Sequence, residues 1–213
     1  MPVSFVKIYE RGISSMDDPN ITSAFERSPI AFFKIMYTYL VNAIPSFNNP
    51  IRISHELSKR TDPEYEIQTF IGDGVSDTFL LSTTPLQDSY FEYVINGNIV
   101  DGSYDAITNT VTFSSVVPLN QKASAEWYFA GEFKDNLIDI VQKILGKLLV
   151  VAWCEKEKNF LLDIRRLLFD TDFKLHDSSG INRAKVNWYD DMREEAEKLM
   201  SQYAWSHNFR KRC

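Results

Sequence analysis

The sequence has little of what most metal-binding, disulfide-rich or thiol-dependent proteins rely on. Its 213 residues include two cysteines and three histidines. Cys154 lies in an apolar helical run and Cys213 is the last residue, so they predict no disulfide framework. His55, His176 and His207 lie far apart in the sequence and match no metal-ligand spacing. We therefore expect neither a metal centre nor any other cofactor.

Signals for membranes and export are also missing. No apolar run reaches the roughly 20 residues that a membrane helix needs. The nearest case, residues 137–153, is interrupted by Asp139, Lys143 and Lys147 among other polar residues. The N-terminal MPVSFVKIYERG lacks the basic start and apolar core of a secretory signal. The expectation is an intracellular, soluble product that does not bind membranes.

Basic charge is scarce as well. The formal net charge is -6, whereas general nucleic-acid binders are usually basic. An acidic balance is still compatible with lining a passage through which DNA slides without sticking. With 44% hydrophobic and 14% aromatic residues, the chain can bury a substantial core and is not disordered.

The hydrophobic pattern divides the chain into three segments and predicts an α+β fold. The first, residues 1–64, reads as helical. Ser28-Pro29 is a strong helix start, because a capping hydroxyl precedes a proline in the first turn. Pro45 ends this helix, and residues 51–60 are a candidate for a short second one. The third segment, residues 132–213, is helical again, and we expect it to pack with the N-terminal helices.

The central segment, residues 65–131, has the rhythm of a small β-sandwich of about seven short strands, with a turn signal roughly every 8 to 12 residues. Asn96-Gly97 is the clearest hairpin signal, because both residues accept the positive φ of a type I′ turn. Asn109 suggests a second hairpin. The predicted strands cover residues 65–71, 78–82, 89–95, 98–101, 104–107, 110–114 and 123–129.

The helical pattern of residues 137–152 shows two apolar rows. One contains Ile138, Val141 and Leu145, and the other Leu137 and Ile144. A small domain is not expected to cover both, so one row is predicted to contact another chain. A later helix carries an apolar stripe through Trp188, Met192 and Tyr203, and its outer face over residues 190–198 is charged. The candidate subunit-interface residues are Leu137, Ile138, Val141, Leu145, Leu148, Trp188, Met192 and Tyr203.

Gly72-Asp73-Gly74 is the first candidate for chemistry. A phosphate-binding fingerprint needs a helix directly after its glycines, but Ser76 to Leu81 read as a strand. Asp73 and Asp77 could hold calcium in principle, yet the loop lacks the dense alternation of acidic ligands that a calcium loop uses. The favoured interpretation is a turn.

The other candidates are weaker. Cys154 could act as a nucleophile, with His176 as its base and Asp177 orienting the histidine. A thiol on an apolar helix, however, is usually an unreactive packing residue. The aromatic residues Tyr90, Phe91 and Tyr93 could stack sugars or bases, against the alternative of a packed sandwich face. The basic tail Arg210-Lys211-Arg212 could contact phosphate or an acidic partner, or simply aid solubility. We predict no catalytic residues and no enzyme.

The pattern F-I-G-D-G-x-S-D-T-F-x-L, followed by Y-V-I-N-G-N, Val111-Thr112-Phe113 and the closing strand 125–129, resembles a small β-module of tailed-bacteriophage virion proteins. That module is often immunoglobulin-like. With its flanking helices, the layout is similar to head-to-tail connector, or neck, proteins. The resemblance implies a structural role without cofactors.

Two functions follow from this resemblance. The first is a neck-ring subunit beneath the portal that joins capsid to tail. Its partners would be further copies in a cyclic, commonly twelve-fold ring, the portal protein, tail or adaptor proteins, and DNA in the channel. The alternative is a tail, baseplate or fibre component whose β-module binds carbohydrate, through Tyr90, Tyr93 and Tyr104, or another virion protein. Both place the protein in the virion, assembled in the host cytoplasm.

Overall fold

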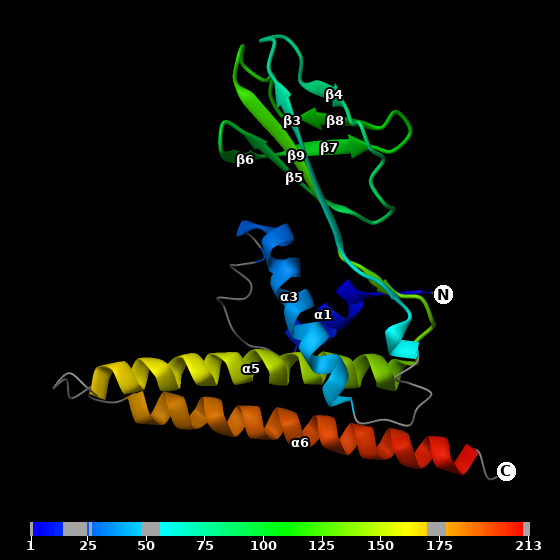
Figure 1. Ribbon diagram of the computed structural model, residues 1–213, viewed down its shortest axis with the longest axis vertical. Coiled ribbons are helices and arrows are strands. Elements are labelled where there is room, and N and C mark those ends of the chain that lie inside the picture. The colour runs from blue at the N-terminus through cyan, green and yellow to red at the C-terminus, as the bar shows by residue number, and fades with distance from the viewer. Residues whose placement is uncertain (1, 15–24, 26, 48–55, 170–177, 211–213) are drawn as a thin grey trace. The chain divides into compact units, whose positions relative to one another are not determined.

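The computed structural model describes residues 2–14, 25, 27–47, 56–169 and 178–210; in residues 157–169, 178–186 and 207–210 only the backbone is described. Helices lie at both ends of the chain and antiparallel strands lie between them, as Figure 1 shows, which confirms the predicted α+β class. His55, His176, Asp177, Cys213, most of Arg210-Lys211-Arg212 and residues 51–55 of the proposed second helix lie outside the described residues.

The chain divides into two compact units, each treated separately below. One combines residues 19–35 with residues 61–132 and contains the β-module. The other combines residues 1–18, 36–60 and 133–213 and is helical. Helix α3 (Pro29–Ala43) contributes residues to both units.

The β-module contains two antiparallel sheets. The larger has the order β3-β9-β5-β6, and the smaller has the order β4-β8-β7. Strand β9 lies in the middle of the larger sheet and pairs over its full length with β3, from Glu64↔Phe129 to Ile71↔Lys122. The strands are β3 (Glu64–Ile71), β4 (Thr78–Leu80), β5 (Tyr90–Ile95), β6 (Asn98–Val100), β7 (Gly102–Asp105), β8 (Thr110–Phe113) and β9 (Lys122–Phe129).

An aromatic cluster fills the space between the two sheets. Phe70 of β3 stacks on Phe79 of β4 with ring centroids 4.9 Å apart, and Tyr93 of β5 meets Phe113 of β8 edge to face at 5.8 Å. Offset and edge-to-face geometries are the favourable ones for aromatic pairs. Trp127, Val111 and Ala125 complete the buried cluster. The module therefore has its own hydrophobic core.

The strand predictions are confirmed to within two residues at most ends. Asn96 and Gly97 have φ values of 51° and 83°, and Ile95 pairs with Asn98, so the predicted two-residue hairpin is present. The second hairpin differs from the prediction. Strand β7 ends at Asp105 and pairs there with Thr110, and residues 106–109 form the loop. Asn109, with φ of 55°, is the last residue of that loop.

Helix α3 begins at Pro29, as Ser28-Pro29 predicted, and the α-helix ends at Ala43, before Pro45. The Ser28 hydroxyl accepts the Ala31 N–H at 3.1 Å, as an N-cap does. A second cap comes from strand β5. The Glu92 carboxylate accepts the Ile30 N–H and the Ser28 hydroxyl, both at 2.8 Å. The sequence predicted the serine cap but not the glutamate.

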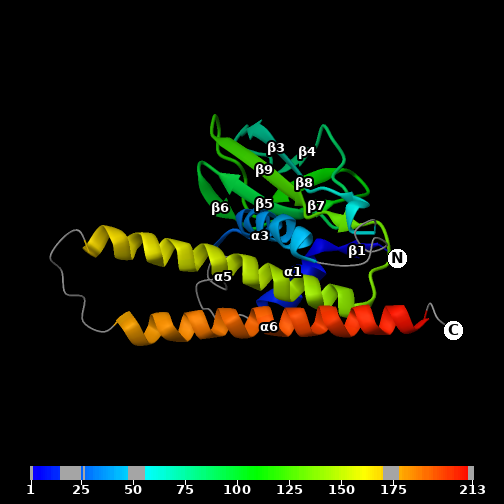
Figure 2. The same cartoon turned by 60° about the horizontal axis from the view of Figure 1, so that its bottom comes forward.

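The helical unit is built on two long helices, α5 (Asp139–Phe169) and α6 (Ser178–Arg210), which run antiparallel side by side (Figures 1 and 2). Helix α1 (Phe5–Ile13) packs on α5, and the second half of α3 adds the buried Met36 and Leu40. A short 3-10 turn, η1 (Ile44–Ser46), follows α3. Three two-residue strands, β1 (Val3–Ser4), β2 (Arg60–Thr61) and β10 (Glu132–Phe133), form a small sheet in the order β1-β10-β2.

Most residues of the two apolar rows are covered by the chain itself, so the premise that one whole row needs another chain to cover it is wrong. Leu137, Val141 and Leu145 are at most 2% exposed, and so is Ile144 from the other row. Ile138 is an exception, at 55% exposed, and it lies just before the helix begins.

Helix α1 explains much of this coverage. It lies within the segment 1–64 that was predicted to be helical, but this helix was not identified individually. Its Phe5, Ile8 and Tyr9 are fully buried at helical spacing, after the N-cap Ser4. Gly12 of α1 meets Gly146 of α5 so closely that a Cβ on Gly146 would lie 3.2 Å from the Gly12 nitrogen. Gly146, which reads as an interruption of the apolar run, is the point where the two helices approach each other.

Candidate functional site

The most unusual local structure in the β-module is a pair of adjoining loops, residues 72–77 and 114–121, which we call the loop pair. Backbone N–H groups of each loop donate hydrogen bonds to carbonyl groups of the other. Gly72 N–H donates to Gln121 O at 2.9 Å, and Asn120 N–H donates to Gly72 O at 2.9 Å. Gly74 N–H donates to Val117 O at 3.2 Å. The loop pair therefore behaves as one continuous piece of structure.

The sequence of the loop 72–77 fits this geometry closely. A Cβ on Gly72 would lie 2.2 Å from the Pro118 carbonyl oxygen, so only glycine fits there. Gly74 has φ of 79°, which also favours glycine. The Asp73 carboxylate accepts the N–H groups of Val75 and Ser76 at 2.8 and 2.7 Å and the Ser76 hydroxyl at 2.7 Å. These hydrogen bonds, chiefly those from Ser76, lower the pKa of Asp73 to about 2.

The loop pair exposes apolar side chains at its tip. Val75 is 79% exposed and Leu119 is 66% exposed, and the Leu119 Cβ lies beside Gly74. Val116 and Ile71 are exposed nearby in the chain. Clustered exposed apolar residues often mark contact surfaces, and a rigid backbone lowers the entropy lost on binding. The sequence held a signal for this surface, because Val75 and Leu119 are apolar residues at turn positions.

The predicted turn at Gly72-Asp73-Gly74 is confirmed. It leads into strand β4 rather than into a helix, so its N–H groups do not form the helix N-terminus that a phosphate site needs. Both Asp73 carboxylate oxygens accept hydrogen bonds within the turn. Within the described part of the chain, no three His, Cys, Asp or Glu side chains come together as a group that could hold a metal ion.

The proposed nucleophile and base are not both described. Cys154 is 5% exposed within the helical unit. His176 and Asp177 lie outside the described residues, as does His55, and of His207 only the backbone is described. A buried thiol among apolar residues is usually inert packing.

Of the three tyrosines proposed to bind carbohydrate, Tyr93 belongs to the core, and Tyr90 and Tyr104 are half-buried against other aromatic residues. Tyr93 is 6% exposed, and burial raises its pKa to about 12. Tyr104 stacks on Phe91 at 4.6 Å, and its hydroxyl donates to the Asn109 Oδ1 at 3.0 Å. Tyr90 lies against Phe33 of α3 at 4.5 Å. They therefore do not form an exposed stacking platform.

Six of the eight proposed interface residues lie in the core of the helical unit. Trp188 is half-buried and meets Trp153 of α5 edge to face, with centroids 6.1 Å apart. Ile138 alone is well exposed. The six are Leu137, Val141, Leu145, Leu148, Met192 and Tyr203, none more than 8% exposed. Their side chains are not available to a neighbouring subunit in this structure.

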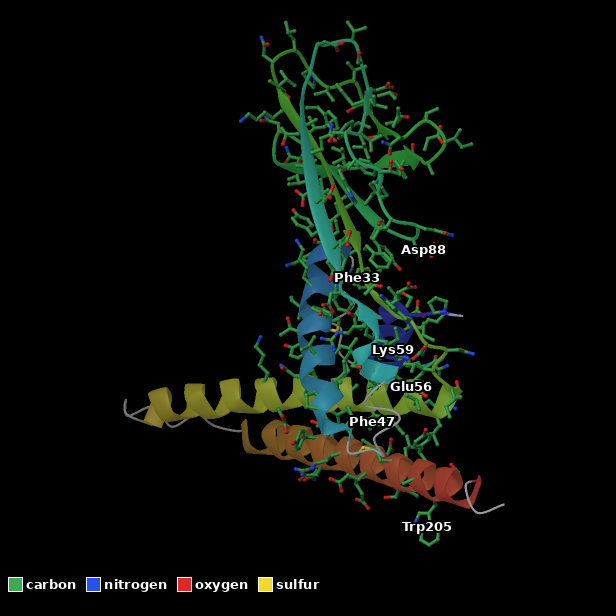
Figure 3. All side chains as sticks on the ribbon, turned by 45° about the vertical axis from the view of Figure 1, so that its right-hand side comes forward. Phe33, Phe47, Glu56, Lys59, Asp88 and Trp205 are labelled. Carbon is green, nitrogen blue, oxygen red and sulfur yellow. The ribbon has the colours of Figure 1, made fainter. Side chains whose placement is uncertain are left out.

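The outer face of α6 is charged, as predicted, and most of its charged residues are acidic. Asp190, Asp191 and Glu194 are exposed. Glu195 pairs with Lys147 of α5 at 2.7 Å, and Glu197 pairs with Arg193 at 3.2 Å. Further along, Trp205 is 71% exposed and points away from the helix (Figure 3).

One shallow hollow lies beside the start of β3. Its volume is about 80 Å³, smaller than the roughly 300 to 1,000 Å³ typical of ligand pockets. Its lining residues are Glu64, Glu66, Thr84, Pro85, Leu86, Ser89, Trp127 and Phe129. A hollow of this size can hold a few water molecules but not a sugar.

Comparison of the chain with models of protein families, with curated proteins and with solved structures found no match. Among the described residues, no helix combines the length and the apolar character that crossing a bilayer requires.

Proposed function

We propose that this protein is a structural virion subunit of the head-to-tail connector type, which assembles beneath the portal and joins capsid to tail. The observation that carries the proposal is the construction of the β-module. The residues that resemble the phage virion module form one folded unit with its own aromatic core. That unit presents a rigid loop pair with exposed Val75 and Leu119.

In this proposal the helical unit contributes in a different way from the one expected. Its apolar rows are internal, so subunit contacts would have to use other surfaces. Exposed Trp205 is one such candidate, because large aromatic residues are enriched at protein interfaces. The acidic outer face of α6 would repel DNA phosphates and so suits a passage through which DNA moves.

The alternative is a tail, baseplate or fibre component. The loop pair favours the version in which the module contacts another virion protein, because its exposed residues are apolar. The carbohydrate version receives no support from Tyr90, Tyr93 or Tyr104, which pack against other aromatic residues.

The test is to locate the protein in particles. Antibodies raised against the purified protein are bound to particles assembled from the genome that encodes it, and the complexes are imaged by negative-stain electron microscopy. We expect label at the junction of head and tail. Label at the far end of the tail would establish the alternative, and unlabelled particles would overturn both.

A matched pair of variants then tests the loop pair. Particles are assembled with Val75→Ser or with Ile107→Ser, a change at a second exposed apolar residue of the same module. We expect Val75→Ser to lower the yield of tailed particles by at least about tenfold, because weakening a contact at an assembly step reduces the yield, and Ile107→Ser to leave it unchanged. Equal yields for the two would exclude the loop pair as the contact surface.

A further inference from the structure

Strand β3 forms an edge of the larger sheet, and its hydrogen-bonding direction can be derived. The pairing with β9 extends one residue past Ile71↔Lys122, because Gly72 N–H donates to Gln121 O. Hydrogen-bonded and non-bonded pairs alternate along an antiparallel ladder. The residues that bond to β9 are therefore Glu64, Glu66, Gln68 and Phe70, and those that direct N–H and C=O outward are Tyr65, Ile67, Thr69 and Ile71.

The pairing of β9 with β5, on its opposite side, predicts the same alternation of hydrogen-bonding residues. Asn96 N–H donates to Lys122 O, and β5 pairs with β9 through Ile95↔Ala123. Lys122 and every second residue after it therefore bond to β5, and Ala123 and every second residue after it bond to β3. None of the backbone hydrogen bonds of the described residues uses the outward groups of β3.

This edge lacks the features that usually protect edge strands. Proteins avoid edge-to-edge association with lysine, proline, bulges or very short strands. Strand β3 contains no lysine or proline, its register with β9 is uninterrupted, and it is eight residues long. Its outward-bonding residues also expose apolar side chains, with Ile67 at 52% and Ile71 at 67%. Tyr65 leans toward β9, because its hydroxyl donates to Glu126 at 2.7 Å.

We propose that β3 pairs with β3 of a second copy, antiparallel and about a two-fold axis, so that the two larger sheets join into one. An isologous contact requires a self-complementary strand. Only residues of the outward set can exchange hydrogen bonds across this edge. The register centred on Gln68 matches all of them, Tyr65 with Ile71 and Ile67 with Thr69, in both directions.

Charge and side-chain type favour this register and this occupant. No glutamate faces a glutamate, because Glu66 lies opposite Phe70 and Glu64 opposite Gly72. Ile67 opposite Thr69 is a pair of exposed β-branched residues, a side-chain type that suits neighbouring strands. If the two-fold axis is moved to Ile67, Pro63 becomes the partner of Ile71. If it is moved to Thr69, the loop residue Asp73 becomes the partner of Tyr65. The other described edge strands, β4, β6 and β7, have at most four residues and cannot cover β3.

The inference does not depend on the proposed function. Copies in a cyclic ring share one orientation, so a two-fold contact is not a ring contact. It would join free subunits, or two rings face to face. Its failure and the failure of the connector proposal are therefore seen in different experiments.

Light scattering with size-exclusion chromatography over a range of protein concentrations tests the pairing. We expect a monomer–dimer equilibrium for the natural protein. Ile67→Lys should raise the dimer dissociation constant at least about tenfold, because an edge lysine opposes pairing. Ile107→Lys, at a residue that is 96% exposed in a loop of the same module, should leave it unchanged.

Thr69→Pro gives a second variant that the fold should tolerate. The Thr69 N–H points outward, so the proline removes a donor from the free edge and none from the ladder with β9. It should weaken the dimer as Ile67→Lys does, with an unchanged circular dichroism spectrum. A natural protein that stays monomeric at its highest soluble concentration overturns the proposal. So does a dimer or larger oligomer that Ile67→Lys and Thr69→Pro leave intact.

A disulfide tests the register. Gln68 lies on the proposed axis in a non-hydrogen-bonded pair, where Cα atoms are about 4.5 Å apart, within the range a disulfide spans. Gln68→Cys, combined with Cys213→Ser, should form a covalent dimer under mild oxidation. Ile107→Cys in the same background should not. Failure of Gln68→Cys to cross-link in protein that light scattering shows to be dimeric would exclude the register.

Discussion

At the residue scale, Asp73 shows how a motif that suggests chemistry serves structure instead. Its carboxylate is exposed and negatively charged, as a cation ligand would be, but it accepts hydrogen bonds from Val75 and Ser76. Gly72 is held against Pro118 and Val117. Each residue of the motif is therefore explained by the path of the backbone.

The lowered pKa of Asp73 predicts a pH-dependent contribution to stability. The folded value of about 2 lies below the ordinary 3.8, so the hydrogen-bonded carboxylate stabilises the fold at pH values above about 4. This contribution is lost as the pH falls toward 2. Asp73→Ala should therefore be less stable than the natural protein at pH 7, and the difference should shrink as the pH falls from 4 to about 2.

Urea unfolding followed by tryptophan fluorescence, repeated across this pH range, measures the difference. Asp101→Ala, at another exposed aspartate of the same module, controls for the loss of a negative charge. The free energies of unfolding of the Asp73→Ala and natural proteins could instead differ by the same amount down to pH 2. That result would contradict the hydrogen-bonded role of Asp73.

At the scale of elements, helix α3 shows how a local signal is completed by a remote residue. Ser28 and Pro29 are enough to predict where the helix begins. Glu92 then accepts the Ile30 N–H and the Ser28 hydroxyl, from a strand more than sixty positions along the chain. A carboxylate at this end also interacts favourably with the helix dipole.

Glu92→Ala should destabilise the protein by about 1 to 2 kcal/mol, because it leaves the Ile30 N–H without its acceptor. Glu92→Gln should cost less, since the amide oxygen can still accept that hydrogen bond. Glu64→Ala, at an exposed glutamate on strand β3, is the control and should change stability by less than about 0.5 kcal/mol. Thermal unfolding compares the four proteins, and equal losses for Glu92→Ala and Glu64→Ala would exclude the cap.

Element boundaries were predictable where the signal is local. The strands of the β-module follow from alternation and from turn residues such as Asn96-Gly97. The end of β7 was misplaced because Asp105 folds back on its own loop, accepting the Ile107 N–H and the Thr108 hydroxyl at 2.9 and 2.7 Å. Those bonds form a turn where the apolar Ile107 reads as a strand residue.

At the scale of the whole molecule, the main question is whether α5 is a core helix or an interface helix. The coverage of both apolar rows by the chain's own residues makes it a core helix. The argument for self-association therefore moves from the helices to the exposed edge of β3 and to the loop pair.

Leu145→Ala separates the two interpretations. Leu145 is fully buried, so its truncation should cost about 2 to 5 kcal/mol of unfolding free energy. Ile138→Ala, at a residue 55% exposed, should cost less than about 1 kcal/mol. Chemical denaturation of dilute protein measures both. A Leu145→Ala variant with natural stability and altered self-association would restore the interface interpretation.

The sequence by itself determined the strands of the β-module and the start of helix α3, because strand alternation, caps and turns depend on residues close together in the chain. Tertiary structure decided which apolar surfaces are covered. Burial of the α5 rows depends on α1 and α6, which approach α5 from distant parts of the sequence, and on the close contact of Gly12 with Gly146. It also decided which side of β3 remains unpaired, because only the position of β9 fixes the direction of that strand's hydrogen bonds.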